Sequence, residues 1–224
     1  TDVIKAQMVA NNQKGKEYNV SVQKYSDYIL KHPKEYSDTV VGLVKSMLNY
    51  GAAAQTLLEY KTSNLANSIL EEPDKVVGDV DFSEYQHRIV KKDNIDIKWY
   101  GSSLLLDSDT YIRDYFILSD EAKIEDYSFY HNSQELTPQK KIMSGTTYYY
   151  VDISNIKAQD LDKDVEVIVQ KRANPNENII ELHYNAFSYA YAMHTSTNPD
   201  ENTEAVTKAM YQYWKMAKAY ETNK

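Results

Sequence analysis

The sequence predicts an α+β fold, in which an antiparallel β-sandwich is flanked by helical hairpins. Three observations predict it. Strand-like segments fill the middle of the chain, two long helical patterns lie toward its ends, and a series of hairpin, short helix and long helix occurs at both ends. We therefore expect a hairpin with two helices over residues 1–62, a short helix and linker over 63–90, the sandwich over 91–187, and a helical hairpin over 188–224.

The middle of the chain contains about seven short segments that alternate apolar and polar residues or are rich in tyrosine and branched residues, as strands are. They are residues 95–100, 103–107, 110–118, 126–131, 147–153, 165–171 and 178–184. Gly101 breaks the first segment from the second, and the turn signal of residues 107–109 follows. Short strands with turn signals between them are typical of an Ig-like sandwich.

One acidic residue of these segments falls on an apolar face. Strand parity over residues 110–118 places Asp114 on the same face as Ile112 and Phe116. We expect Asp114 to mark a sheet edge, or to pair with Arg113 or a tyrosine hydroxyl.

The two long helical patterns have apolar residues at spacings of three and four, so each predicts one helical face. The first face contains Val40, Leu43, Met47, Tyr50, Ala54 and Leu57, and the second contains Val206, Met210, Tyr213, Ala217 and Tyr220. Ser37 with Asp38, and the run 199–202, are candidate N-caps. The small residues of Gly51–Ala54 predict a close crossing with another helix.

The two ends of the chain predict an internal repeat. At a shift of 163, Tyr50 falls on Tyr213 and Ala54 on Ala217; upstream the shift is 162, which places His32 on His194. Asn-rich turns are expected over residues 11–15 and 174–178. With this period, residues 1–62 are expected to be the tail of a preceding repeat unit.

The bulk composition restricts the partners. The 224 residues include no cysteine and give a net charge of −8, and no basic run exceeds two residues. An acidic chain of this kind is a poor partner for nucleic acid, and no apolar stretch approaches the ~20 residues of a membrane-spanning helix. We expect neither nucleic-acid binding nor membrane insertion. Because the sequence begins at Thr1 without a methionine, we expect either a mature, processed chain or a part excised from a longer protein.

The motifs that carry chemistry are missing from the sequence. The five histidines do not stand at metal-ligand spacing, and no nucleophile elbow or phosphate-binding glycine loop is present. His32 and His194 are expected to have local capping roles. The acidic run 160–164 lacks the glycine and the bidentate glutamate of a calcium loop, so we expect a solvated turn. The sequence predicts no catalytic residue, no metal site and no cofactor, and therefore no enzyme.

Tyrosine is the unusual feature of the composition, with 21 residues against 4 phenylalanines and 2 tryptophans. Its ring has an apolar body and a polar tip, which suits both half-buried strand positions and glycan-binding faces. The candidate ligand-binding residues are Trp99, Tyr100, Tyr148 and Tyr150, since aromatic rings on a flat sheet can stack on sugars. The alternative is that these rings support the helices.

Several segments together resemble a known but uncharacterised module. They are VKSMLNYGAAAQ, LEYKTSNLAN, YGSSLLLDSDTYIRDYFIL, TYYYVDISNIKAQDLDKDVEVIV and KAMYQYWKMAKAY. The resemblance covers the chain from about Tyr18 to Tyr220, and the module recurs in large secreted or cell-surface proteins of gut Clostridia and related Firmicutes. It implies an extracellular or cell-surface location in a Gram-positive bacterium, and other modules of the same polypeptide as partners. It implies no activity.

The function expected from these observations is that of a non-catalytic extracellular module, either a structural spacer or an interaction unit of a larger bacterial protein. Its outside partner would be a glycan or a host or cell-surface protein. The alternative is a carbohydrate-binding module that uses an exposed Tyr/Trp face. A glycan-processing enzyme with an unrecognised carboxylate pair is a third hypothesis, and it would need two carboxylates roughly 5–10 Å apart in a cleft.

Overall fold

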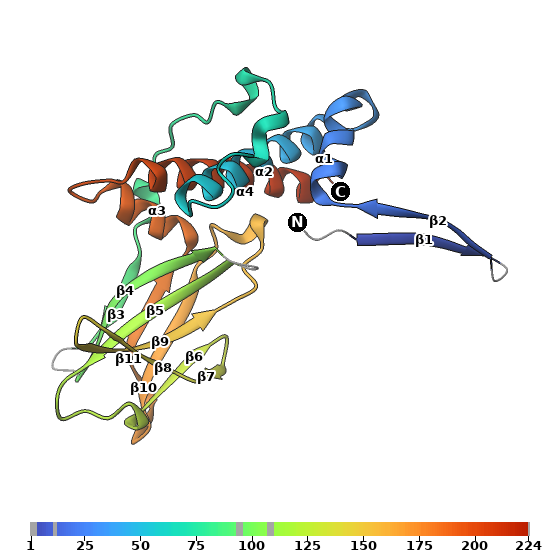
Figure 1. Cartoon of the computed structure of the whole chain (residues 1–224). Coiled ribbons are helices and arrows are strands. Elements are labelled where there is room, and N and C mark those ends of the chain that lie inside the picture. Colours follow the sequence, from blue (N-terminus) through green and yellow to red (C-terminus); the bar gives the residue numbers. More distant parts are fainter. Residues whose placement is uncertain (1–3, 11–12, 93–95, 107–109, 224) are drawn as a thin grey trace. The chain divides into compact units, whose positions relative to one another are not determined.

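The structure, a computed structural model, describes residues 4–10, 13–92, 96–106 and 110–223; for residues 4–10 and 13–20 it describes the backbone alone. The described part has an α+β fold with four α-helices and two larger antiparallel sheets, one of five strands and one of four (Figure 1). The chain divides into two compact units. The first unit is Thr1–Asp79 with Lys208–Lys224, and the second unit is Val80–Thr207.

The first unit begins with a hairpin and two helices. In chain order these are β1 (Ile4–Ala10), β2 (Gln13–Val20), α1 (Val22–Lys31) and α2 (Asp38–Leu57). The Ser21 side chain caps α1 by accepting a hydrogen bond from the backbone N–H of Lys24 at 3.2 Å, and the expected cap Ser37 accepts from Val40 at 3.3 Å. None of the helices in the described part is long and apolar enough to span a bilayer.

The buried stripe of α2 differs from the predicted face. Val44, Leu48 and Ala52 are buried, whereas the six predicted residues, from Val40 to Leu57, are only half-buried. Val44 and Leu48 share a small core with Ile29 of α1. The prediction missed this stripe because α2 is covered on more than one side, so apolar spacing alone does not identify the side that α1 covers.

A second side of α2 holds the segment that follows it in the chain. The Asn49 side chain donates to the backbone carbonyl of Asp74 at 2.7 Å and accepts from Asn67 at 3.0 Å. The Gln55 side chain accepts from the backbone N–H of Ala66 at 2.6 Å. A Cβ at Gly51 would lie 3.1 Å from the Cβ of Ala66, so another part of the backbone does come close to this glycine, but it is the short returning segment that begins at Ala66 and not a crossing long helix.

A third side of α2 meets the last helix, α4 (Glu201–Thr222), through the part of α4 that belongs to the first unit. The rings of Tyr50 and Tyr213 stack with centroids 5.7 Å apart and planes 18° apart. A Cβ at Gly42 would lie 2.9 Å from the Met216 sulfur, so the backbone of α2 comes close to α4 here. Burial raises the pKa of both tyrosines above the ordinary value. The two residues that stack are the ones that the predicted repeat places at corresponding positions.

Short 3₁₀ helices replace the short helix expected within residues 63–90. They are η2 (Ala66–Ile69), η3 (Glu72–Lys75) and η4 (Ser83–Tyr85). The expected domain boundaries at residues 62, 90 and 187 differ from the division into two units, because η4 lies with the sheets. The helix α3 (Ala186–His194) also belongs to the unit of the sheets. Phe82, which precedes η4, packs against Phe187 of α3 with ring centroids 5.9 Å apart.

The second unit contains nine strands in its described residues. They are β3 (Arg88–Lys91), β4 (Ile97–Leu106), β5 (Thr110–Leu118), β6 (Tyr127–His131), β7 (Gln134–Leu136), β8 (Gln139–Met143), β9 (Thr146–Ile153), β10 (Val165–Lys171) and β11 (Asn174–Tyr184). The strand order is β3-β11-β10-β6-β7 in one sheet and β4-β5-β9-β8 in the other. The bounds predicted for β5 and β10 are confirmed, whereas β3, β7 and β8 were missed. The break expected at Gly101 is a register irregularity inside the continuous strand β4, and the expected turn at 107–109 lies outside the described residues.

One hydrophobic core takes its residues from both sheets. Its fully buried members include Ile112 and Phe116 of β5, Phe129 of β6, Val167 of β10 and Leu182 of β11. Each of these belongs to the apolar set of an alternating strand, so the pattern of period two determines which face is buried.

The order of elements at the two ends of the chain is the same. The series β1, β2, α1, α2 corresponds to β10, β11, α3, α4. The offsets, however, are not the uniform 162 expected upstream: β1 begins at Ile4 and β10 at Val165, 161 residues later, whereas α1 and α3 begin 164 residues apart at Val22 and Ala186. The extra length lies in β11, whose register with β10 shifts twice. The common origin of the two series stays a prediction.

The structure describes the second of the two expected Asn-rich turns in full and the first only in part. Of the first, expected at 11–15, Asn11 and Asn12 lie outside the described residues, and Gln13, Lys14 and Gly15 form the start of β2. The turn expected at 174–178 is wrong, because these residues form the start of β11 and the turn is at Arg172 and Ala173. Asn residues favour turns, but in this segment the pairing of β11 with β10 outweighs that local preference.

Candidate functional site

Three of the four predicted ligand-binding residues lie together on the four-stranded sheet. The rings of Tyr100 and Tyr148 meet edge to face at 4.8 Å, and Tyr115 lies 6.3 Å from Tyr148 and 5.8 Å from Tyr150. Of the predicted residues only Tyr100 is exposed, at 60%, whereas Tyr148 is 8% exposed and Tyr150 half-buried. The hydrogen bond with Tyr100 is the main cause of the raised pKa of Tyr148. The cluster is therefore a set of rings in mutual contact, of which Tyr100 is the most exposed.

Charged and polar side chains extend the tyrosine cluster along the same face. Arg113 donates to both oxygens of the Asp152 carboxylate, from Nε at 2.6 Å and from Nη2 at 2.7 Å. Its guanidinium carbon lies 4.0 Å from the centre of the Tyr150 ring, and the Tyr150 hydroxyl donates to Gln139 at 2.8 Å. A bidentate pair fixes Arg113 in place. Its hydrogen bonds with Asp152 raise the pKa of Arg113, so it stays charged.

Tyr115, Arg113 and Asp152 were not predicted as members of this face. A signal is present, because strand parity puts Arg113 and Tyr115 on the face opposite Asp114, and the register pairs Tyr115 with Tyr150 and Arg113 with Asp152. Cross-strand pairs of this kind lie on one face of a sheet. The strand order, which places β9 beside β5, was the part that the sequence did not provide.

Trp99 does not belong to the tyrosine cluster. It packs against the hydrophobic core between the sheets, with its ring 4.6 Å from His87 and 6.4 Å from Tyr184. Its indole N–H donates to the Ser102 hydroxyl at 3.1 Å. The grouping of Trp99 with Tyr100, Tyr148 and Tyr150 is therefore wrong as a single surface. Trp99 and Tyr100 are consecutive residues of a strand, and consecutive strand residues face opposite sides.

The hydrogen bond from Trp99 to Ser102 is followed by a second one, from Ser102 to the buried Asp114. The Ser102 hydroxyl donates to Oδ1 of Asp114, which is 1% exposed, and no described residue bonds its Oδ2. Burial raises the pKa of Asp114 from 3.8 to about 7; the bond from Ser102 opposes this shift and the charge of Asp152 adds to it. Burial, and next the charge of Asp114, also raises the pKa of Tyr184. A carboxyl group in this setting is protonated over most of the acidic range.

The expectation for Asp114 was only partly met. Asp114 is on the apolar face as predicted, but it does not mark a sheet edge, because β5 lies between β4 and β9. It does not pair with Arg113, which binds Asp152, and its hydrogen-bond partner is Ser102. Ser102 could not be predicted as the partner of Asp114, because the register of β4 shifts between Trp99 and Gly101 and changes which residues of β4 lie opposite β5.

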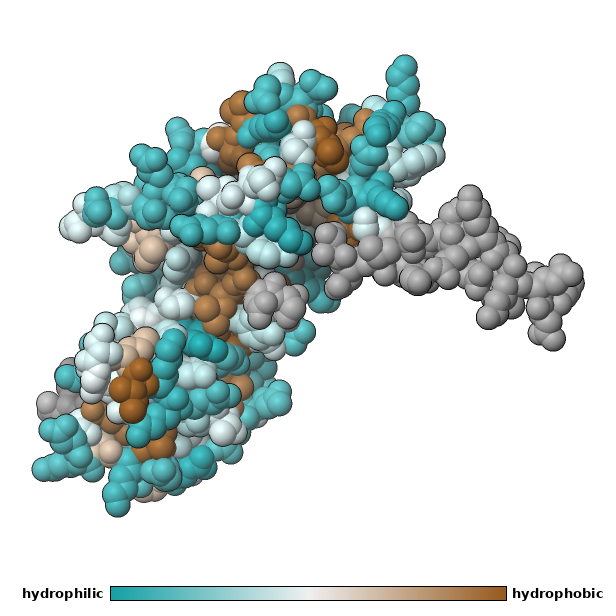
Figure 2. Space-filling view, in the orientation of Figure 1, coloured by the Kyte–Doolittle hydropathy of each residue, from teal (hydrophilic) through white to brown (hydrophobic). Residues whose placement is uncertain are grey.

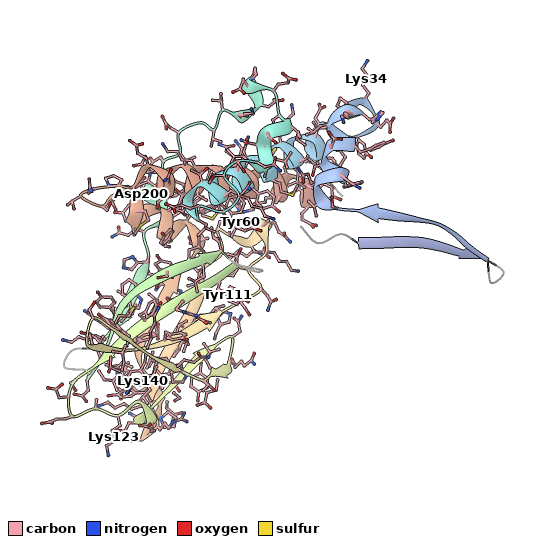
Figure 3. The ribbon with its side chains drawn as sticks, in the orientation of Figure 1. Lys34, Tyr60, Tyr111, Lys123, Lys140 and Asp200 are labelled. Atoms are coloured by element: carbon pink, nitrogen blue, oxygen red, sulfur yellow. The ribbon has the colours of Figure 1, made fainter. Side chains whose placement is uncertain are left out.

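Each unit also has a hollow of its own. One hollow of the first unit has a volume of about 350 Å³ and is lined by α1, α2 and the segment after α2, through Val22, Met47, Gly51 and Tyr60 among others. Figure 3 labels Tyr60, which belongs to the segment after α2. The hollow of the second unit has a volume of about 290 Å³ and a mixed charge, in which Lys171 lies 3.2 Å from Asp96. Figure 2 shows that mostly hydrophilic and intermediate residues cover the visible surface of the second unit.

The remaining residues singled out by the sequence have separate local contacts. His32 follows α1 and lies 3.5 Å from Glu35, whereas the His194 side chain bonds the Thr207 hydroxyl at 2.8 Å. In the acidic run, Asp160 pairs with Lys163 at 2.7 Å, as a solvated turn would. Within the described residues, no group of three or more His, Cys, Asp or Glu could hold a metal ion.

Comparison of the chain with protein-family models, curated proteins and solved structures gives no match. The resemblance to a Firmicutes surface module thus remains an expectation from the quoted sequence segments. What the chain does has to be argued from its own geometry.

Proposed function

We propose that the chain is a non-catalytic module of a larger extracellular bacterial protein, which acts as a spacer or interaction unit among modules of the same kind. The observation that carries this proposal is the recurrence of one series of elements at both ends of the chain, with a β-hairpin entering a short helix and then a long helix each time (Figure 1). Recurring units stacked along a chain are the architecture of spacers and of extended binding surfaces.

The most distinctive sequence motif supports a structural role. Three residues of the Asn49–Gln55 stretch position other parts of the first unit: Asn49 and Gln55 hold the returning segment, and Tyr50 stacks on Tyr213. These contacts account for the motif without a ligand.

Three finer features belong to the same proposal. The two sheets of the second unit, which share one core, form an Ig-like sandwich. The two series of elements descend from one repeat unit. The location is the surface or exterior of a Gram-positive cell, for which the support is the sequence resemblance; an antibody against the chain should label intact producing cells, and labelling only after lysis would contradict this location.

The alternative function is carbohydrate binding. Its support is Tyr100, which exposes 60% of its surface next to the ring of Tyr148. Against it stands the inward position of Trp99 and the burial of Tyr148, since a sugar-stacking platform needs more than one accessible ring face. We therefore favour the spacer or interaction role.

A glycan array separates the two functions. The purified chain is expected to bind no glycan reproducibly. The Tyr100→Ala variant tests any signal, and Tyr25→Ala is the matched control, because Tyr25 is an exposed tyrosine of α1 in the other unit, at 55%. Binding that is lost in Tyr100→Ala and kept in Tyr25→Ala would contradict the proposed function and establish the alternative.

A further inference from the structure

Within the described residues, neither outer edge of the β1–β2 hairpin has a neighbouring strand. β1 and β2 pair only with each other in the part of the chain that the structure describes, and they form a two-stranded sheet that leads into α1 (Figure 1). A hairpin of two strands is marginally stable at best in water. Its free edges present unpaired backbone N–H and C=O groups, which are a template for another strand.

The equivalent hairpin of the second unit has both edges covered. β6 pairs with the outer edge of β10, with Phe129 opposite Val169, and β3 pairs with the outer edge of β11, with Ile89 opposite Leu182. The hairpin β10–β11 therefore lies inside a five-stranded sheet and leads into α3 in the same way as β1–β2 leads into α1.

The register of the two hairpins agrees at the end next to the helix. Ile4 is opposite Val20 and Ala6 is opposite Tyr18, as Val165 is opposite Tyr184 and Val167 opposite Leu182. Cross-strand partners share a face. The two pairs of β10–β11 are buried in the core, and the corresponding pairs of β1–β2 are also composed of apolar or aromatic residues, so the hairpin has the pattern of a strand pair made for a sandwich core.

We propose that β1–β2 completes the five-stranded sheet of another unit of this kind, pairing antiparallel along β1 with a strand like β6 and along β2 with a strand like β3. The inference rests on the proposed function, because it takes the chain as one of several similar modules. In the inferred register, Met8 is opposite the equivalent of Phe129, and Tyr18 is opposite the equivalent of Ile89. The sheet edges in this chain's own second unit are already filled by β10–β11, so the partner is a unit that lacks its last hairpin.

A fusion supplies such a partner from known sequence. A second copy of residues 80–161 is joined directly before Thr1 of the full chain. Along the fused sequence, β1 then follows the added strands after the same number of residues as β10 follows β9 in the second unit. Hydrogen exchange followed by mass spectrometry then reports on the backbone amides of β1 and β2. We expect them to exchange about 100-fold or more slowly than in the unfused chain, because strands inside a sheet open only with their whole cooperative unit.

The matched control carries Ile89→Pro and Phe129→Pro in the added copy alone. Proline removes a ladder hydrogen bond and is not accepted by a central strand pairing, so the hairpin amides of this control should exchange as fast as in the unfused chain. Equal exchange in the fusion and the unfused chain would overturn the proposal, and so would an equal slowing in the proline control.

Two further outcomes can be measured on the same proteins. Slowing of hairpin exchange in the unfused chain as its concentration rises would overturn the proposed partner in favour of edge pairing between two copies of the hairpin. Glycan binding at Tyr100 would overturn the proposed function without changing the exchange of β1 and β2, so the two failures can be told apart.

Discussion

The two β-hairpins of the chain share their register next to the following helix and differ in what surrounds them. β10–β11 is paired on both edges and contributes Val167, Val169 and Leu182 to the core, each with 0% exposure. β1–β2 is likewise followed by a short and then a long helix, but it has no strand at either edge in the described residues. The comparison shows that strand sequence and turn specify a hairpin, and that neighbouring strands and a core stabilise it.

The two long helices extend the comparison. Gly51 of α2 corresponds to Trp214 of α4 at the shift of 163. Gly51 leaves room for the loop at Ala66, whereas Trp214 fills space itself, with 9% exposure and a ring contact to Tyr211 at 5.0 Å. The two positions thus differ in residue type according to what packs on them, whereas the stacked residues Tyr50 and Tyr213, also related by this shift, are both tyrosine.

The largest expected effect comes from breaking the support of β10. Phe129 is fully buried, pairs with Val169 and contacts the Phe116 ring at 5.1 Å. Phe129→Ala should lower the free energy of unfolding of the second unit by about 3–5 kcal/mol, measured by urea unfolding with Trp99 fluorescence in a Trp214→Phe background. Hydrogen exchange of β10 and β11 should accelerate while that of β1 and β2 stays the same. Equal acceleration in both hairpins would contradict the difference between them.

The second effect concerns the buried carboxyl of Asp114. Its folded pKa of about 7 exceeds the ordinary 3.8, so on raising the pH the unfolded chain loses this proton first. The contribution is fully present below about pH 4 and falls between about pH 4 and 7, by about 1.4 kcal/mol per pH unit. Asp114→Asn should flatten this part of the stability profile of the second unit.

The control for the Asp114 prediction is Asp126→Asn, because Asp126 is an exposed aspartate of the same unit. Urea unfolding of the three proteins at pH 5 and pH 8 gives the comparison. Wild type and Asp126→Asn should lose stability between these values more steeply than Asp114→Asn. The same slope in all three would mean that Asp114 is ionised in the folded protein at pH 5.

The smallest effect compares equivalent positions of the two helices. Ala217 of α4 is 7% exposed, whereas Ala54 of α2 is half-buried. Ala217→Leu should overpack its site and cost about 1–3 kcal/mol, and Ala54→Leu should cost less because its side chain has an open side. Thermal unfolding followed by circular dichroism measures both, and a larger loss for Ala54→Leu would show that our assignment of the helix faces is wrong.

The sequence predicted those parts of the fold that local pattern determines. Alternation over residues 110–118 and 165–171 gave β5 and β10, and the side chain of Asp200, from the predicted cap run, accepts from the backbone N–H of Thr203 at 2.7 Å near the start of α4. Short edge strands such as β7 and β8 have little alternation of burial and were missed. The buried stripe of α2 was missed because three separate partners cover this helix.

The candidate site was predictable only in part, for a related reason. Parity places Tyr148 and Tyr150 on one face, and the sequence shows this. Whether Trp99 or Tyr100 joins them depends on the register of β4, and whether a ring is exposed depends on the neighbouring strand. Tyr100 is exposed, whereas Tyr148 and Tyr115 are buried and contact rings that come from other strands, which are nonlocal contacts.

Native-state hydrogen exchange of the unmodified chain tests the central claim most directly. The amides of β10 and β11 should be protected up to the global stability of the second unit, by factors of about 10³ or more. Those of β1 and β2 should exchange within about tenfold of an unstructured peptide, as a lone hairpin does. Protection of β1–β2 comparable to that of β10–β11 in the dilute, unfused chain would contradict the account.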